Sequence, residues 1–429
     1  MSDGGACSER SEESHNTLLA MTATLEDKRR LLLEIFQAAL TAVNGRQRVR
    51  AFFAAHPLDA VVHLVALGKV ACAMARGAAE ALGDNIASGL VITKRGHAEA
   101  LPWPVLEAGH PIPDASSLAA GERLTRFIAA LPRSAHVLVL LSGGASALVE
   151  HLPAGATLET LREMNHWLLA SGRDIAAVNR VRKRLSRLKG GRLAQLLAPR
   201  PVTCLAISDV EGDDPRFIAS GLLVPDETVL HESVEDAPPA VRSALEGAPP
   251  LPLPDDPCFK NVRFEIIARL ADAMQASAEA ARARGLTPEI HREFVRGDAL
   301  AAGSRLAQAI LTVPPGILHI WGGETTVRLP PRPGRGGRNQ TLALSAARVL
   351  QNQDALLLAA GTDGTDGPTP DAGALVDGGT LGRGALLGQS AEAALARADA
   401  GSFLEASGDL VQTGPTETNV MDLMLGLRY

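Results

Sequence analysis

The chain has 429 residues, of which 46% are hydrophobic, and it carries a formal net charge of −6 at pH 7. This length exceeds what one ordinary hydrophobic core supports, so we expect two domains. The acidic balance, without a basic stripe interleaved with aromatic residues, excludes a nucleic-acid-binding surface. No apolar run reaches the roughly 18 to 20 residues that cross a membrane, so we expect no membrane span.

The N-terminal segment 1–23 is polar and has no apolar signal core, so we expect a disordered tail and no export. Helical apolar spacing over 24–43, with Thr24 as a cap, predicts the first ordered element. No cysteine belongs to a Cys-x-x-Cys pair, which argues against a disulfide framework and a structural zinc site. These features indicate a cytoplasmic protein. The four cysteines are Cys7, Cys72, Cys204 and Cys258.

The first predicted junction between a strand and a helix carries a lysine. The apolar run 61–67 predicts a strand, Gly68 and Lys69 follow it, and the alanine-rich run 70–82 predicts a helix. A lysine at such a turn can reach a phosphate as a point charge. The alternative is an ordinary solvated lysine.

The second junction contains a glycine loop. The apolar run 136–141 predicts a strand that leads directly into Ser142, Gly143 and Gly144, and a helix can open behind them. Glycines let the backbone approach a ligand, and unpaired N–H groups at a helix start point at an anion. Ser146 adds a hydroxyl group. We predict a phosphate-binding loop here, with a plain tight turn as the alternative.

Further polar candidates follow in the N-terminal half. His110 and Asp114 lie in a proline-rich loop, where turn and capping chemistry is as plausible as a site role. The predicted helix 174–188 is strongly basic, and we interpret most of its charges as a solvated face. Lys189 and Arg192, beside two glycines, are better candidates for anion binding. The basic residues of the helix are Arg180, Arg182, Lys183, Arg184 and Arg187.

Acidic residues follow the predicted strand 201–207. Carboxylates at the carboxyl edge of such a strand are where α/β enzymes hold Mg²⁺. We therefore consider Asp209 a candidate metal ligand, and an acidic loop that caps the next helix is the alternative. The acidic residues are Asp209, Glu211, Asp213 and Asp214.

The proline-rich segment 236–257 is the clearest change in composition, and we place a domain boundary there. The predicted division is a first domain over 24–240, a linker over 241–257 and a second domain over 258–429. Strands and helices alternate again in the second half. This alternation predicts another α/β domain with a mostly parallel sheet.

The second half contains the densest polar motifs. Glu324 follows a predicted strand, and Arg335 and Arg338 lie in a glycine-rich stretch before a helix that Asn339 can cap. An arginine at a helix N-terminus suits a bidentate grip on a carboxylate or phosphate. The alternative is a flexible hairpin.

Asp363 lies in a run of Asp, Gly and Thr that follows the predicted strand 355–360. The run lacks the closing Glu of an EF-hand, so we do not expect a calcium loop of that type. A hydroxyl-rich turn over 413–416 precedes what we expect to be a C-terminal helix.

Taken together, these motifs resemble the class II glycerate 2-kinases, whose C-terminal half is the MOFRL domain. The matching segments occur in the family's order and span roughly 61–423. They are ALGKVACAMA (66–75), GHPIPD (109–114), LLSGGASALVE (140–150), VNRVRKRLSRLKGGRLA (178–194), ISDVEGDD (207–214), GGETTV (322–327), GRGGRNQTLAL (334–344), AAGTDGTDGPT (359–369) and TGPTETNVMDL (413–423).

The resemblance implies transfer of the ATP γ-phosphate to the 2-hydroxyl of D-glycerate, with Mg²⁺. It also implies a Rossmann-like N-terminal domain and a C-terminal MOFRL domain, with the active site in the cleft between them. The family's lysine of the Gly-Lys motif and second arginine of Gly-x-Gly-Gly-Arg-Asn-Gln fall on Lys69 and Arg338. Expected partners are small molecules, D-glycerate and ATP, and the expected assembly is a monomer or homodimer.

Within that reaction we assign hypothetical roles. Lys69, Arg338 and Asp209 are the catalytic candidates. The predicted nucleotide-binding residues are Ser142, Gly143, Gly144, Ser146 and Lys189. The predicted substrate-binding residues are Arg335, Glu324, Asp363 and Asn339, and Asp209 and Asp363 are the candidate Mg²⁺ ligands.

Two loops depart from the family pattern. Glu417 stands where the family usually has Gly, Met421 where it usually has Asn, and Pro370-Asp371 where Asp-Ala is more common. A kinase for another small hydroxy acid therefore stays open. So does an NAD(P)-dependent hydroxypyruvate reductase, a label that some relatives carry, although no Gly-x-Gly-x-x-Gly follows the first strand. A binding or regulatory protein on the same fold is the third alternative.

Overall fold

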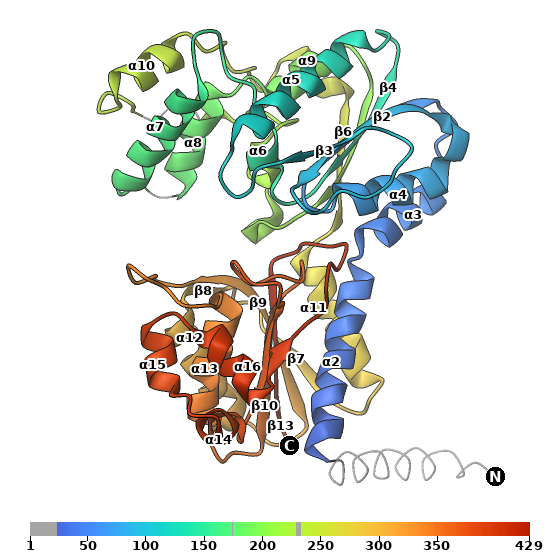
Figure 1. Cartoon of the computed structure of the whole chain (residues 1–429). Coiled ribbons are helices and arrows are strands. Elements are labelled where there is room, and N and C mark those ends of the chain that lie inside the picture. The colour runs from blue at the N-terminus through green and yellow to red at the C-terminus, as the bar shows by residue number, and fades with distance from the viewer. Residues whose placement is uncertain (1–23, 174, 229–232) are drawn as a thin grey trace, which may run out of the picture. The chain divides into compact units, whose positions relative to one another are not determined.

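The computed structural model describes residues 24–173, 175–228 and 233–429 (Figure 1). The predicted N-terminal tail lies outside the described residues. By its internal contacts the chain forms two compact units, one made of 45–269 and the other of the segment up to Asn44 together with 270–429. Within the described part of the chain, no helix has the length and apolarity to cross a bilayer.

The unit 45–269 is built on a six-stranded sheet in the order β3-β2-β1-β4-β5-β6, and all of its strand pairs are parallel. This is the strand order of the doubly wound dinucleotide-binding fold, so the Rossmann-like prediction is confirmed. The order reverses between β1 and β4, where such folds open a crevice at the carboxyl ends of the strands. The strands are β1 Val62–Leu67, β2 Ile86–Lys94, β3 Val105–Ala108, β4 His136–Leu141, β5 Val202–Ile207 and β6 Val262–Ala268.

Helices cover both faces of this sheet (Figure 1). Alternate strand residues such as Val65, Val139 and Cys204 form one core with α5 and α9. On the strands' other side α4 contacts β1 and β2, and α3 contacts α4 and β6. The helices are α3 Gly45–Ala55, α4 Ala71–Leu82, α5 Ala115–Ala130, α6 Ala145–Leu148 and α9 Arg192–Leu197.

A small helical cluster completes this unit. It contains α7 Leu158–Ala170, α8 Ile175–Leu185 and α10 Pro239–Glu246, which share an apolar core. The prediction that the basic residues of α8 form a solvated face is wrong for Lys183. Its side chain is buried, and its ammonium donates to Asp226 at 2.5 Å and to the Arg216 carbonyl at 2.7 Å.

The predicted domain boundaries are wrong. Strand β6 pairs with β5 in the first sheet, so the first unit continues through the proline-rich segment to Arg269. That segment packs on its own unit, because the Arg192 guanidinium donates to the carbonyls of Pro249 and Pro250. At the other end, the helix that precedes Gly45 belongs to the second unit. Strand pairing between β5 and β6 sets the first limit, and packing of α2 (Leu25–Ala42) on α11 (Leu270–Arg282) sets the second, so composition sets neither.

The second unit contains a mixed sheet in the order β12-β11-β10-β13-β9-β7, with β8 also paired to β9. The prediction of a mostly parallel sheet is wrong here, because only the pairs β7–β9 and β8–β9 are parallel. The predicted C-terminal helix is a strand that lies between β10 and β9. The strands are β7 Thr287–Ile290, β8 Val295–Asp298, β9 Ile317–Thr326, β10 Ala355–Gly361, β11 Gly373–Asp377, β12 Leu410–Val411 and β13 Asp422–Arg428.

Helices also lie on both faces of the second sheet (Figure 1). Helices α2 and α11 pack together, and α11 contacts β7, β9 and β13, whereas α12, α13 and α16 enclose the larger core on the opposite face. Thr24 caps α2 as predicted, in a capping box with Asp27. The helices are α2 Leu25–Ala42, α11 Leu270–Arg282, α12 Ala299–Leu311, α13 Arg338–Leu350, α14 Thr380–Leu386, α15 Ala391–Ala396 and α16 Ala400–Ser407.

Candidate functional site

The two predicted loops of the first unit lie side by side at the point where the strand order reverses. The Lys69 N–H donates to the Gly143 carbonyl at 2.9 Å, and the Val70 N–H donates to the Ser142 hydroxyl oxygen at 3.0 Å. Ser142 is fully buried, so its hydroxyl joins the two loops. The backbone N–H groups of Gly143 and Gly144 have no acceptor among the residues that the structure describes. The geometry of an anion-binding loop is therefore present.

Gly144 is the position on which side chains from two other segments converge. Its φ of 85° is left-handed, which favours glycine. A Cβ placed there would lie 3.0 Å from the His110 ring and 3.2 Å from Cγ of Lys69. Space and backbone conformation both demand glycine, and the loop thereby brings Lys69 and His110 next to the same backbone.

A cavity of about 330 Å³ opens beside this loop. Its volume is within the range of small-molecule sites. Three predicted site residues besides Gly144 line it: Ser146, Lys189 and Asp209. The Ser146 and Ser220 hydroxyls are 2.6 Å apart on its wall. Residues that follow β4 and β5 therefore meet at one polar hollow.

The basic residues near the cavity are held by partners within the unit. The Lys189 ammonium forms a buried ion pair with Glu150, and both side chains line the cavity. Arg192 is also buried, but its guanidinium donates to the backbone carbonyls of Lys183 and Ser186, so the interpretation of Arg192 as an anion ligand is wrong. Burial lowers the pKa of Arg192 to about 10.

The cavity also contains residues outside the predicted site. His110, Asn179 and Arg182 line it, and Arg182 donates to Asn165 at 2.9 Å. The spacing of Asn179 and Arg182, three apart on one helix, is the sequence signal that places both on one face. Asp114 is a helix cap, since its carboxylate accepts the N–H groups of Ser116 and Ser117 at the start of α5.

Carboxylates surround Arg338 in the second unit. Its guanidinium donates to both oxygens of Asp422, at 2.6 and 3.0 Å, and to Glu324 at 2.6 Å. Burial alone would lower the pKa of Arg338, but the hydrogen bonds and charge of Asp422, followed by Glu324, raise it. The Asp422 side chain is 1% exposed and that of Glu324 46%. Arg338 is therefore paired with one buried carboxylate and one exposed carboxylate.

Asn339 does not cap α13, because Gly337 is the N-cap residue and Asn339 lies inside the helix. The carboxylate of Asp366 instead accepts the N–H groups of Asn339 and Gln340, at 3.1 and 2.8 Å. Asn339 is fully buried, so its side chain does not face solvent, and its substrate role stays a prediction. Burial, opposed by the two N–H groups, raises the pKa of Asp366 to about 7.

The remaining predicted site residues of this unit, Arg335 and Asp363, also form hydrogen bonds with protein groups. Arg335 donates to Glu405 at 2.6 Å and to Asp371 at 2.8 Å, so the unusual Asp371 supplies one of its partners. Asp363 accepts the N–H and hydroxyl of Thr365 at 3.0 and 2.9 Å. Both residues therefore have hydrogen-bond partners within the unit, and their substrate roles stay predictions.

The two other departures from the family pattern have left-handed backbones. Glu417 has φ 57° and Met421 has φ 72°. Glycine and asparagine adopt this region far more readily than other residues. The Glu417 carboxylate accepts the Asn44 side-chain amide at 3.1 Å, and the Met421 carbonyl accepts the Thr362 hydroxyl at 2.6 Å. At both positions this chain therefore has a residue that a left-handed backbone disfavours, where the family usually has one that tolerates it.

Comparison with known proteins gives two family matches. Residues 31–238 match a domain family of unknown function, DUF4147, and residues 317–422 match the MOFRL family. A D-glycerate 2-kinase of Thermotoga maritima is 37% identical over 94% of this chain and 99% of its own. The chain belongs to the glycerate 2-kinase family. A crystal structure of the Thermotoga maritima glycerate kinase superposes with a TM-score of 0.84 at 36% identity, covering 94% of this chain and all of that one.

The family also contains members with another label. A putative hydroxypyruvate reductase of Agrobacterium vitis is 36% identical over 92% of this chain and 93% of its own length. The predicted resemblance to glycerate 2-kinases, with its MOFRL domain and its two α/β halves, is confirmed by these matches.

Proposed function

We propose that this protein is a kinase that transfers the γ-phosphate of ATP to the 2-hydroxyl of D-glycerate, giving 2-phosphoglycerate and ADP. The observation that carries the proposal is the junction of Lys69 with the Ser142-Gly143-Gly144 loop where the strand order reverses. Phosphoryl transfer needs positioning and charge neutralisation more than covalent chemistry. A lysine beside unpaired backbone N–H groups supplies both.

The nucleotide phosphates would be bound by the N–H groups of Gly143 and Gly144, with Lys69 neutralising the transferring group. Ser146 offers a hydroxyl at the wall of the adjacent cavity. Lys189 contributes through Glu150, because the buried ion pair fixes both groups at that wall. Ser142 acts by holding the two loops together.

MgATP would be the phosphoryl donor. Asp209 fits a magnesium ligand, since it is a half-buried carboxylate that lines the cavity and Mg²⁺ prefers oxygen ligands. Bound Mg²⁺ neutralises charge on the phosphates. Asp363 is the weaker candidate, because one of its oxygens already accepts two hydrogen bonds from Thr365.

Arg338 would bind an anionic group of a reactant. We propose that it keeps Asp422 and exchanges Glu324 for that anion, because only Glu324 is exposed enough to leave. A planar guanidinium already oriented by one carboxylate suits bidentate binding of a second. Arg335, which is bound to Asp371 and Glu405, would assist in the same way.

A coupled assay with ATP, Mg²⁺ and D-glycerate tests the proposal, with the product identified as the 2- or the 3-phosphate. We expect ADP release that depends on D-glycerate, and 2-phosphoglycerate as product. Nucleotide binding without ADP release would contradict the glycerate assignment and indicate another hydroxy acid. Oxidation of NADH or NADPH with hydroxypyruvate, without ATP turnover, would replace the kinase by a reductase.

A further inference from the structure

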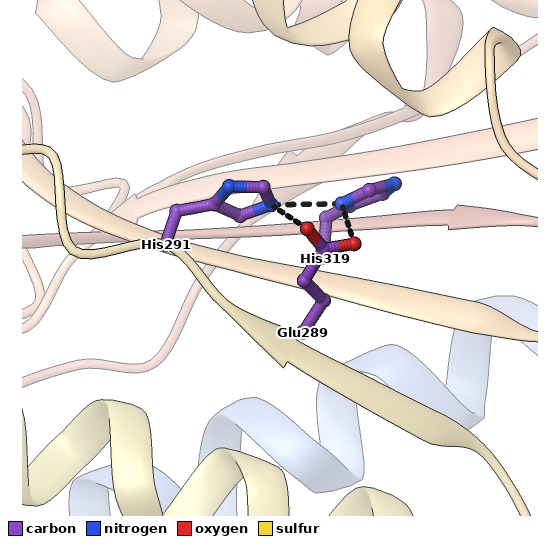
Figure 2. A group of neighbouring side chains, drawn as sticks. All are labelled: Glu289, His291 and His319. Atoms are coloured by element: carbon purple, nitrogen blue, oxygen red, sulfur yellow. Dashed lines mark hydrogen bonds and ion pairs between the residues drawn. The ribbon is translucent and has the colours of Figure 1, made fainter.

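Two histidines and a glutamate meet on one face of the second unit's sheet, and none of the three belongs to the candidate site described above. Strands β7 and β9 pair in parallel with Glu289 opposite His319, and the His291 N–H continues the ladder to the Ile320 carbonyl at 2.9 Å. Side chains two apart on a strand share a face. Glu289, His291 and His319 therefore project together, and Figure 2 shows the Glu289 carboxylate directed at a nitrogen of each ring.

The spacing of the three donor atoms matches a metal site. His291 Nε2 and His319 Nδ1 are 2.8 Å apart. The Glu289 oxygens lie 3.9 Å from His291 Nε2 and 3.5 Å from His319 Nδ1. Tetrahedral Zn²⁺ with bonds of about 2.0–2.2 Å holds its ligand atoms roughly 3.3–3.6 Å apart. The three separations bracket that value, so small side-chain rotations convert the cluster into a coordination shell.

The surroundings hold the rings in place. Trp321 stacks on both of them, with centroid distances of 4.7 Å to His291 and 5.0 Å to His319. The side chain of His319 is 3% exposed, whereas those of His291 and Glu289 are 26% and 51% exposed. One ligand is thus fixed in the core, and the outer two leave the fourth coordination position on the solvent side.

We propose that Glu289, His291 and His319 form a binding site for one Zn²⁺ ion, with water as the fourth ligand. Two imidazoles and a carboxylate favour zinc or a similar transition metal over Mg²⁺, which prefers oxygen ligands alone. The ion would link the four-residue edge strand β7 to its neighbour β9 and stabilise that edge of the sheet.

The hydrogen bonds made by the ligating rings determine the expected strength of the site. His319 Nε2 is buried without a hydrogen-bond partner among the described residues. A ligating histidine usually donates its other N–H to an acceptor, and loss of such a partner costs about 10- to 100-fold in metal affinity. We therefore expect zinc to bind this site more weakly than a structural zinc site whose ligating histidines all donate to an acceptor.

Equilibrium dialysis of the full chain, freed of metal by a chelator, against Zn²⁺ in the presence of excess Mg²⁺ tests the proposal. We expect one zinc ion per chain at this site and a zinc-dependent rise in the unfolding temperature. His291→Gln and Glu289→Gln should each weaken that binding by more than about tenfold and abolish the rise. Glu279→Gln, at an exposed position of α11, is the matched control and should bind as the unaltered chain does.

A second readout uses Trp321. Because Trp321 stacks on both rings, Co²⁺ or Ni²⁺ at the site should quench its fluorescence, and Trp321→Phe should remove that quenching. The proposal fails if the two ligand variants bind zinc as tightly as the Glu279→Gln chain, or if no zinc is retained at all. Either failure leaves the kinase proposal untouched, because none of the three residues has a role in it.

Discussion

The two units position their candidate site residues by different means. In the first unit, backbone geometry positions these residues. Two loops at the ends of β1 and β4 are joined by hydrogen bonds, and Gly144 leaves room for the side chains of Lys69 and His110 beside it. In the second unit, carboxylates orient the arginines, as Asp422 does for Arg338. The first arrangement leaves two N–H groups without an acceptor among the described residues, and the second gives Arg338 one exposed carboxylate partner.

Because of this difference, we expect some substitutions to lower activity and others to lower stability. Removing a group that stands on a backbone loop should affect the reaction and leave the fold intact. Removing one member of a buried ion pair leaves the other charge uncompensated, which is strongly destabilising. Substituting each residue tests whether it acts mainly on the reaction or mainly on the stability of the fold.

Lys189→Met should have the largest effect on stability. Lys189 belongs to the first unit but is held as the arginines of the second unit are, by a buried carboxylate, that of Glu150. Breaking such a pair from one side costs about 3–5 kcal/mol. Urea unfolding should show that loss, and the double variant Lys189→Met/Glu150→Gln should recover much of it. A Lys189→Met protein as stable as the unaltered chain, with weakened ATP binding, would make Lys189 a direct phosphate ligand.

Lys69→Ala should leave the free energy of unfolding nearly unchanged and lower kcat by about 10² to 10³, as loss of one preorganised charge does in other active sites. Steady-state kinetics of the coupled assay measure the first quantity and urea unfolding the second. Lys260→Ala, at an exposed position of the same unit, is the control for removing a lysine. Near-normal turnover in Lys69→Ala would remove this residue from the catalytic assignment.

The sequence was sufficient for the first unit's loops because their signals are local. A strand, a glycine turn and a helix follow each other within about ten residues at Ser142, and Lys69 lies in the same kind of junction. It was insufficient for the partners of Arg338, because Asp422 lies far along the chain and reaches it through strand pairing. For the same reason Asp366, 27 residues beyond Asn339, took the capping role predicted for that asparagine.

The C-terminal strand β13 shows that the local sequence was also insufficient to predict the secondary structure there. The segment 422–428 is rich in leucine, which has good helix propensity, and this favoured a helix. In the structure it lies between β10 and β9 and is paired along its length with both. Pairing with two distant strands outweighed the local preference, and no pattern within the segment itself could reveal that.

Asp366→Asn should change how stability depends on pH. The native pKa of Asp366 is raised to about 7, above the ordinary value near 3.9 of an unfolded aspartate. Between these values the native state holds a proton that the unfolded state has lost, so the contribution of Asp366 to stability falls as pH rises, by up to about 1.4 kcal/mol per pH unit. Relative to the Asn variant, the unaltered chain should therefore lose stability from about pH 4 to about pH 7 and stay level above it.

Urea unfolding at a series of pH values measures this difference, with the exposed Asp354→Asn as control. A constant difference between the unaltered chain and Asp366→Asn across that window would mean that Asp366 is ionised throughout. The two N–H groups that it accepts at the start of α13 would then outweigh its burial.

The smallest predicted effect concerns the strained loop at Glu417. A left-handed backbone costs a non-glycine residue about 1–2 kcal/mol, part of which is returned by the lower entropy of its unfolded chain. Glu417→Ala and Glu417→Gly both lose the hydrogen bond from Asn44, so their difference isolates the backbone. We expect the Gly variant to be about 1 kcal/mol more stable than the Ala variant in urea unfolding.

At Glu279, inside α11, the order should reverse, because glycine costs about 1 kcal/mol relative to alanine within a helix. An Ala variant more stable than the Gly variant at both positions would show that position 417 carries no strain, and that its carboxylate alone accounts for the departure.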